Sequence, residues 1–383
     1  MTAILIVNAG SSSLKLRVLD EKDAMTGSAD LAPPRGADDD AEIKAVLGRF
    51  GDVHAVGHRI VHGGSLFTAP VKIDAGVLAR LRALTDLAPL HQPKSLAAVE
   101  AVQRARPGLP GVACFDTAFH ATIPAAAATY ALPREWRLRW ALRRYGFHGL
   151  SHSYAARRAA ELATAASPLR VITCHLGAGA SLAAVHGGVS VDTTMGFTPL
   201  EGLVMATRSG TVDPGLVLWL AEHAGTPPAE LATTLEHRSG LLGLAGTADM
   251  REVVARAAAG DRDARLALDV YVHRLRAGIA GMAASLGGLD VLAFTGGVGE
   301  NSVAVRSEAA AGLGFLGVRL DAGRNAAAAG GGGPAGGGDS EIGQAGAPVR
   351  SFVIAAREDI EIADQVRAVL GADGDEPPGL PPG

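Results

Sequence analysis

Cysteine is nearly absent from this chain: only Cys114 and Cys174 occur in 383 residues. Both lie in apolar, strand-like runs, so we expect buried, reduced thiols rather than a disulfide or a metal cluster. No apolar run approaches the roughly 20 residues of a membrane span. The N-terminus also lacks a basic segment followed by an apolar stretch and a cleavage site. These absences predict a cytoplasmic protein.

The chain also has no excess of positive charge, because 35 Lys and Arg face 39 Asp and Glu, a net charge of −4. Bulk electrostatics therefore gives no support for a nucleic-acid partner, and an anionic ligand would have to be held by local arginines. The patterns G-x-x-x-x-G-K-[ST], G-x-S-x-G, H-E-x-x-H and paired C-x-x-C are missing. Their absence excludes a P-loop NTPase and the chemistries that the other three patterns carry.

The length and composition that remain are those of an ordinary globular protein. With 48% hydrophobic and 19% charged residues, 383 residues suffice for two domains. Apolar runs of strand length alternate with helical patterns, which predicts an α/β class. We expect strands at 3–8, 14–19, 54–61, 111–115, 170–175, 181–185, 290–295 and 350–355, and helices at 74–86, 94–105, 150–165, 214–224, 262–286 and 357–370.

A strand–turn–strand plan occurs twice. The apolar strand that ends at Asn8 is followed by a turn of small and hydroxyl residues and then by a strand that carries Lys15. Residues 171–185 (VITCHLGAGASLAAV) repeat this plan, and a third strand–glycine turn follows at 293–301. Small residues let backbone N–H groups approach an anion closely. The repeated plan predicts a duplicated fold with nucleotide phosphates between its halves.

Four charged or titratable residues stand out by their sequence settings. Arg59 lies in GHRIVHGG and Arg208 in ATRSGTVDP, where the choice is between solvated surface charges and an oxyanion clamp. Asp116 follows an apolar strand, where it either meets a ligand or caps the next turn. His148 lies between Gly146 and Gly149, which favours a shaped loop over a core histidine bonded to backbone.

The order of the longer motifs resembles the acetate kinase family. The stretches are NAGSSSLKL, GHRIVHGG, LAPLHQP, FDTAFH, YGFHGLSH, HLGAGAS, MGFTPLEGL, TRSGTVDP and FTGGVGEN, from residue 4 to about residue 362. The resemblance implies the duplicated actin/Hsp70/sugar-kinase (ribonuclease H-like) fold with an active-site cleft between two domains. It implies a homodimer that transfers phosphate reversibly between ATP and acetate with Mg²⁺, or Mn²⁺ in its place, and without nucleic-acid or membrane partners.

The same resemblance implies domain limits. Residues 1–118 and 360–372 would form an N-terminal domain, with the last helix packing back onto it. Residues 119–359 would form the C-terminal domain for nucleotide binding and dimerisation. The segment 373–383 is rich in proline, glycine and acidic residues, and we expect a disordered tail there.

Roles for individual residues follow from the resemblance alone. Arg59 and Arg208 would bind the carboxylate and the transferring phosphoryl group, Asp116 would position the reactants, and His148 would donate to the equatorial oxygens. Asn8 and Glu358 would hold Mg²⁺. The methyl pocket would be Val61, Leu90, Phe147 and Pro199. The ATP-binding residues would be Ser11, Ser13, Lys15, His175, Leu176, Gly177, Ala178, Gly179, Asp249, Met250, Arg251, Gly296, Gly297, Val298, Gly299, Glu300 and Asn301.

Departures from the family pattern leave two alternatives open. Ala178 and Ala180 replace an amide and a hydroxyl that could donate to phosphate, and Arg357 stands where an asparagine usually precedes the metal-site glutamate. A cation there would compete with Mg²⁺ unless its side chain points away. One alternative is therefore a nucleotide-binding homologue with little kinase activity. The other is a kinase that prefers propionate or butyrate, because the sequence does not fix pocket depth to one methylene.

Overall fold

The computed structural model describes residues 3–10, 13–32, 40–88, 91–164, 168–329 and 338–372. The expected disordered tail at 373–383 lies outside these ranges. The chain divides into two compact units. Unit 1 comprises Met1–Phe119 and Arg357–Gly383, and unit 2 comprises His120–Ala356. Glu358, which the sequence-based limits assign to the other domain, belongs to unit 1 because it begins the helix that packs on the unit 1 sheet.

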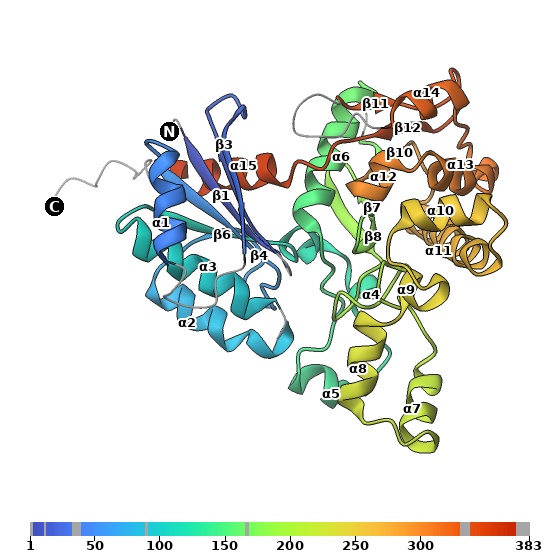
Figure 1. Ribbon diagram of the computed structural model, residues 1–383, viewed down its shortest axis with the longest axis horizontal. Coiled ribbons are helices and arrows are strands. Elements are labelled where there is room, and N and C mark those ends of the chain that lie inside the picture. Colours follow the sequence, from blue (N-terminus) through green and yellow to red (C-terminus); the bar gives the residue numbers. More distant parts are fainter. Residues whose placement is uncertain are drawn as a thin grey trace, which may run out of the picture. The chain divides into compact units, whose positions relative to one another are not determined.

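Unit 1 is built on a six-stranded sheet (Figure 1). Its strand order is β3 (Met25–Leu31), β2 (Leu14–Leu19), β1 (Ile4–Ala9), β4 (Ala55–Ile60), β6 (Gly111–Phe115) and β5 (Val71–Lys72). Strands β1, β4 and β6 are parallel, whereas β1, β2 and β3 form an antiparallel meander. The carboxyl ends of β1, β4 and β6 therefore lie at one edge, where α/β proteins place ligands.

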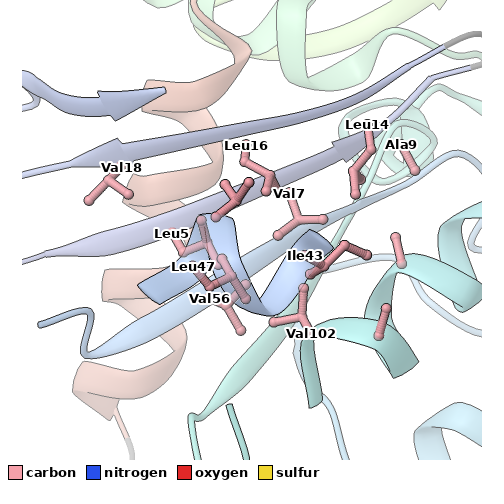
Figure 2. Close-up of a cluster of buried hydrophobic side chains, with 13 residues drawn as sticks. Leu5, Val7, Ala9, Leu14, Leu16, Val18, Ile43, Leu47, Val56 and Val102 are labelled. Carbon is pink, nitrogen blue, oxygen red and sulfur yellow. The ribbon is translucent and has the colours of Figure 1, made fainter. Parts of the chain in front are cut away.

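The core of unit 1 follows from the period-2 alternation of its strands. Leu5 and Val7 of β1 point to the same face as Leu16 of β2 (Figure 2). They pack against α1 (Asp40–Arg49) and α3 (Gln92–Ala105). A second apolar cluster joins α3 to α2 (Ala75–Ala83), whose first turn is capped by the Asp74 side chain.

Helix α15 (Glu358–Ala372) covers the opposite face of this sheet (Figure 1). The contact depends on a glycine, because a Cβ on Gly57 would lie 2.3 Å from Ile362 Cγ2 and 2.8 Å from Val366 Cγ2. Ile362 and Val366 are themselves fully buried. The last helix of the chain is therefore fixed directly against β4, the strand that carries Arg59.

Unit 2 repeats the topology of unit 1. Its sheet has the order β11 (Ser340–Glu341), β12 (Arg350–Val353), β10 (Val291–Thr295), β7 (Arg170–Leu176), β8 (Ala180–His186) and β9 (Val189–Thr193). Strands β7, β10 and β12 are parallel, and β7, β8 and β9 form the antiparallel meander. Each unit 2 strand thus has a unit 1 counterpart, which confirms the predicted duplication.

Alternation along β7 places two helices on opposite faces of the unit 2 sheet. Thr173 and His175 point toward α6 (Gly149–Ala163), whereas Cys174 points toward α11 (Arg262–Leu286). The other helices of unit 2 are α4 (Ala125–Ala128), α5 (Arg134–Arg139), α7 (Pro214–His223), α8 (Pro228–His237), α9 (Gly240–Ala245), α10 (Met250–Ala258), α12 (Gly296–Asn301), α13 (Val303–Ala311) and α14 (Ala322–Ala327).

Most expected elements are present, with one correction. The prediction of a third glycine turn is wrong at residues 296–301. These residues form the short helix α12, which Gly296 begins directly after β10. A positive φ of 77° at Gly296 makes this sharp entry possible. Cys114 and Cys174 are buried free thiols, as expected. Among the helices that the structure describes, none has both the length and the apolar character needed to cross a membrane.

Candidate active site

The cluster of predicted site residues in unit 1 centres on Arg59. Arg59 lies on β4, and Asp116 follows β6, the parallel neighbour of β4. Arg59 Nε donates to Asp116 Oδ1 at 2.9 Å, and Arg59 Nη2 donates to Asp116 Oδ2 at 2.6 Å. This two-point pairing fixes the plane of the guanidinium. Asp116 therefore orients Arg59 and does not merely cap a turn.

Two further predicted residues complete the cluster. Arg59 Nη1 donates to the Asn8 amide oxygen at 3.1 Å, and Asn8 Nδ2 donates to Glu358 Oε2 at 3.3 Å. Asn8 comes from β1 and Glu358 from the first turn of α15, so four elements meet here. Lys15 of β2 lies opposite Asn8 of β1. Because residues that lie opposite each other in an antiparallel pair have side chains on the same face of the sheet, Lys15 lies on the face that carries the Asn8 side chain.

The charges of this cluster support one another. Burial alone would lower the pKa of Arg59, but the carboxylates of Asp116 and Glu358 outweigh it and raise that pKa above its ordinary value. Burial raises the pKa of the Asp116 carboxyl, and the adjacent guanidinium opposes that rise. Asp116 is only 1% exposed, so removal of Arg59 would leave a buried carboxylate without its cation.

Arg357, the departure beside Glu358, has its own partners. Its Nε donates to Asp359 Oδ1 at 2.9 Å and its Nη2 donates to Asp359 Oδ2 at 3.0 Å. A longer contact of 3.5 Å reaches the Asp23 carbonyl. Asp359 thus holds the Arg357 guanidinium in a two-point ion pair.

The predicted site residues of unit 2 gather at the turn between β7 and β8. Gly177 N–H donates to Gly179 O at 2.9 Å and closes the turn, with Ala178 exposed at its tip. The loop of Arg208 is joined to it, because Ala206 N–H donates to the Ala178 carbonyl at 3.1 Å. Arg208 Nη1 in turn donates to the Pro199 carbonyl at 3.1 Å. Burial lowers the pKa of Arg208, and Glu236 opposes that shift.

His148 and Arg208 converge on the turn at Gly179. A Cβ on Gly179 would lie 3.1 Å from His148 Nε2 and 3.7 Å from Arg208 Nη1. Any side chain at position 179 would therefore enter the space that the two donors face. His148 immediately precedes α6 with a φ of +55°, a sparsely populated conformation for a non-glycine residue, as the flanking glycines led us to expect of a shaped loop.

A cavity of about 1110 Å³ adjoins this turn within unit 2. Most of its walls are apolar side chains and small residues from the turn, from α10, α11 and α12 and from the start of α13. The lining residues are Gly177, Ala178, Ala206, Leu241, Ala248, Asp249, Met250, Arg251, Val254, Tyr271, Gly297, Val298, Asn301, Ser302, Val303 and Ala304. The structure thus gathers eight predicted nucleotide residues around one hollow of a size that accommodates a nucleoside.

Other predicted nucleotide residues do not line this cavity. Leu176 is fully buried in β7, and His175 accepts or donates a 2.8 Å bond at Ser151 Oγ. Gly296 begins α12, and Gly299 lies in its middle. The Glu300 carboxylate accepts the N–H groups of Gly296 and Ala356, so Glu300 shapes the backbone beneath the cavity. Ser13 accepts a backbone bond from Gly10 in the first hairpin.

The predicted methyl pocket is distributed over both units. Val61 is a buried residue of unit 1, whereas Phe147 and Pro199 belong to unit 2. Leu90 and the phosphate-loop residue Ser11 lie outside the described residues. The make-up of this pocket therefore stays a prediction.

Three site residues were missed by the sequence reasoning. Tyr271 of α11 lines the cavity, and its buried hydroxyl has no hydrogen-bond partner within the described structure. Ser181 is hydrogen-bonded to the ring of His148, and His152 is hydrogen-bonded to Ser181. The only available signal was position: Ser181 lies two residues after Gly179 and His152 one helical turn after His148.

Similarity to known proteins agrees with this geometry. A sequence model of the Acetokinase family matches residues 37–364. Acetate kinase from Deinococcus deserti is 44% identical over 403 residues, covering 97% of this chain and 99% of that protein. The crystal structure of Porphyromonas gingivalis acetate kinase superposes with a TM-score of 0.86 at 33% identity, covering 97% and 100%. A propionate kinase from Francisella tularensis superposes with 0.87 at 34%, covering 96% and 100%.

Proposed function

This chain belongs to the acetokinase family, and from that premise we propose that it transfers the γ-phosphoryl group of ATP reversibly to acetate. A carboxylate oxygen of acetate attacks the γ-phosphorus in line, the bond to the bridging oxygen of ADP breaks, and acetyl phosphate forms. The observation that carries the proposal is the convergence of Arg208 and His148 on Gly179, at the rim of the 1110 Å³ cavity.

This reaction requires the protein to neutralise the negative charges of the carboxylate and the phosphates. The nucleophile is already an anion, so no strong general base is needed, and the obstacle is to bring it to a polyanion. Arg59 and Arg208 would bind the carboxylate and the transferring phosphoryl group through their planar forks. His148 would donate from Nε2 to an equatorial oxygen. Asp116 would fix the orientation of the Arg59 guanidinium, and its two hydrogen bonds to that group support this role.

The nucleotide would occupy the unit 2 cavity. The apolar walls formed by Met250, Val254 and Val298 suit a flat base. The small residues at the tip of the Gly177–Gly179 turn would let backbone N–H groups approach its phosphates. Ala178 contributes no side-chain donor, but its backbone N–H remains. We therefore propose that the two alanines weaken phosphate binding without abolishing it.

Magnesium fits the residues of unit 1. The described residues contain no group of three or more His, Cys, Asp or Glu side chains that could enclose a metal. Magnesium in phosphoryl-transfer sites needs only one or two protein oxygens and takes its other ligands from water and phosphate. Glu358 and Asn8 would supply them, with the ion taking the place of the hydrogen bonds that join Asn8 to Glu358 and to Arg59. The ion, or Mn²⁺ in its place, would neutralise charge on the phosphates.

Acetate is the proposed acceptor because the named sequence relatives are acetate kinases. The propionate kinase structure, however, superposes as well as the acetate kinase structure does. A propionate or butyrate preference is therefore the second candidate, and it changes the acceptor without changing the mechanism.

Association into a homodimer has support from α7. This helix carries the apolar run GLVLWL but buries none of its residues, and Leu218 and Trp219 are 62% and 53% exposed. A helix with so much exposed apolar surface is typical of an interface. A cytoplasmic location follows from the need for ATP and agrees with the two free thiols.

Trapping of the product tests the proposed function. The protein is incubated with ATP, Mg²⁺ and acetate in the presence of hydroxylamine, which converts acyl phosphate to a coloured hydroxamate. Formation of acetohydroxamate that depends on all three components is the expected result. Tight ATP binding without hydroxamate from any short carboxylate would instead favour the nucleotide-binding homologue.

A further inference from the structure

Four histidines of unit 2 lie together around α6. The rings of His148 and His175 stack with centroids 4.3 Å apart, and His152 lies 6.2 Å from His175 and 5.6 Å from His120. His120 and His152 are fully buried. The proposed function uses His148 and leaves His152 without a role.

A chain of hydrogen bonds links His148 to the sheet. His148 Nδ1 lies 2.9 Å from Ser181 Oγ, which lies 2.7 Å from His152 Nε2. His152 Nδ1 lies 2.7 Å from Thr173 Oγ1. Thr173 points to the same face of the sheet as His175, two residues further along β7, and Ser181 of β8 is the cross-strand partner of His175. His152 follows His148 by one helical turn, so both rings lie on the side of α6 that faces this sheet.

The number of hydrogens restricts this chain to two arrangements. Burial, reinforced by His120 and His175, lowers the pKa of His152 well below its ordinary value, so the ring is neutral with one N–H. The Ser181 hydroxyl has one hydrogen and two imidazole neighbours, so it donates to one and accepts from the other. The donations therefore all run toward His148 or all run away from it.

Thr173 decides between the two directions. In the described structure, His152 is the one recorded partner of the Thr173 hydroxyl. If His152 donated to Thr173, the threonine hydrogen would be buried without an acceptor, at a cost of about 1–3 kcal/mol. If Thr173 donates to His152, then His152 Nε2–H donates to Ser181 and Ser181 donates to His148 Nδ1. Every hydrogen of the chain then has an acceptor.

We propose that Thr173 and His152, acting through Ser181, are positioning residues that hold neutral His148 in the tautomer with its hydrogen on Nε2. Nε2 and its neighbour Cε1 are the ring atoms nearest to the Cβ position of Gly179, each at 3.1 Å, so Nε2 is the ring nitrogen on the side of Gly179 and Arg208. The tautomer makes His148 a hydrogen-bond donor toward that space without a positive charge. The catalytic part of this inference rests on the proposed function, whereas the tautomer itself does not.

Nitrogen NMR of the histidine side chains tests the tautomer. The full-length protein is labelled with ¹⁵N-histidine and studied at pH 8, with His148 assigned from the His148→Gln spectrum. The expected result is an Nε2–H signal pattern for His148. Thr173→Val, which keeps the shape and removes the hydroxyl, should shift His148 toward Nδ1–H, and Thr173→Ser should restore Nε2–H.

Kinetics then tests the consequence. Thr173→Val should lower kcat about tenfold, the loss of roughly one hydrogen bond in the transition state, with KM for ATP within about twofold. Thr193→Val is the matched control, because the Thr193 hydroxyl is equally buried but donates to the Leu182 carbonyl. It should lower stability and leave tautomer and kcat unchanged.

Several outcomes would overturn the inference. An Nδ1–H tautomer in the unmodified protein would do so, as would an unchanged tautomer in Thr173→Val. If that variant does not fold, Ser181→Ala cuts the chain next to His148 and must shift the tautomer in its place. Failure of the proposed function is recognised separately, since a protein that makes no acyl phosphate still yields the tautomer.

Discussion

At the scale of single residues, Arg59 is the most demanding test of the proposed roles. Arg59→Gln should lower kcat by on the order of 10²-fold or more, because a charged transition-state donor is lost. The change also leaves Asp116 buried without its cation, so activity is measured on protein whose folding has been verified by circular dichroism.

Arg17 provides the control for Arg59. It also lies on a strand of unit 1, but its partner Asp30 is 55% exposed, whereas Asp116 is buried. Arg17→Gln should leave kcat within about twofold, since exposed pairs contribute little. Full activity in Arg59→Gln would remove Arg59 from the mechanism.

Gly179 tests the convergence of His148 and Arg208. In Gly179→Ala the new methyl group would lie in the space between the two donors, so kcat should fall at least tenfold with the overall fold retained. Gly281→Ala on α11 adds the same methyl group where a Cβ meets nothing within 4 Å. Equal kinetics in the two variants would mean that no reacting group enters the space beside Gly179.

Which residues the sequence could identify depended on their surroundings. Arg59 and Arg208 were detectable because a charged residue within a glycine-rich stretch has few structural reasons to be there. Tyr271 and Ser181 lie in apolar runs that are indistinguishable from ordinary core. Their importance arises from the faces on which α11 and β8 place them, which only tertiary packing determines.

At the scale of elements, Gly57 tests the packing of α15. Gly57→Ala should destabilise the protein by about 1–3 kcal/mol, because its methyl group would overlap Ile362 and Val366. Gly48→Ala is the matched control in the last turn of α1, where a Cβ meets nothing within 4 Å, and it should leave the free energy of unfolding unchanged or slightly higher. Urea unfolding of both variants measures the two free energies, and destabilisation by Gly48→Ala of equal size would contradict the packing account.

Two of the elements that the sequence missed have weak apolar patterns. Strand β3 reads MTGSADL and is half-exposed at the edge of its sheet, so no buried run marks it. Helix α12 is rich in glycine, which disfavours helices, and it forms because Arg306 donates to the carbonyls of Gly299 and Glu300 at its end. Central strands such as β1 and β7, buried on both faces, were recognised without difficulty.

At the scale of the whole molecule, buried neutral histidines set the response to acid. Burial lowers the pKa of His58 to about 3 and, despite an opposing bond to the Phe147 carbonyl, that of His120 to about 4. The unfolded state therefore binds protons first, so stability is complete above pH 6.5 and is lost as the pH falls toward 4. Each of these histidines should remove about 2 kcal/mol of unfolding free energy between pH 7 and pH 5.

Urea titrations at the two pH values measure this loss. His58→Gln should show a smaller acid effect than the unmodified protein, whereas the exposed His223→Gln should show the same effect. A stability that does not change between pH 7 and pH 5 would mean that these rings are charged or hydrated when folded.

Self-association is the second property of the whole molecule that can be measured. Light scattering should give twice the chain mass of 38.9 kDa. Leu218→Glu on α7 should shift the protein toward monomer, whereas Phe315→Glu, 74% exposed elsewhere in unit 2, should not. A monomer at micromolar concentration before any substitution would refute the homodimer.

The central claim is that this chain phosphorylates a short carboxylate, acetate first. The most direct measurement compares kcat/KM for formate, acetate, propionate and butyrate in the ATP- and Mg²⁺-dependent hydroxamate assay. The account predicts the highest value for acetate, with a difference of about 10–200-fold per added methylene. A maximum at propionate or butyrate would contradict the proposed acceptor, and no product from any of the four acids would contradict the kinase itself.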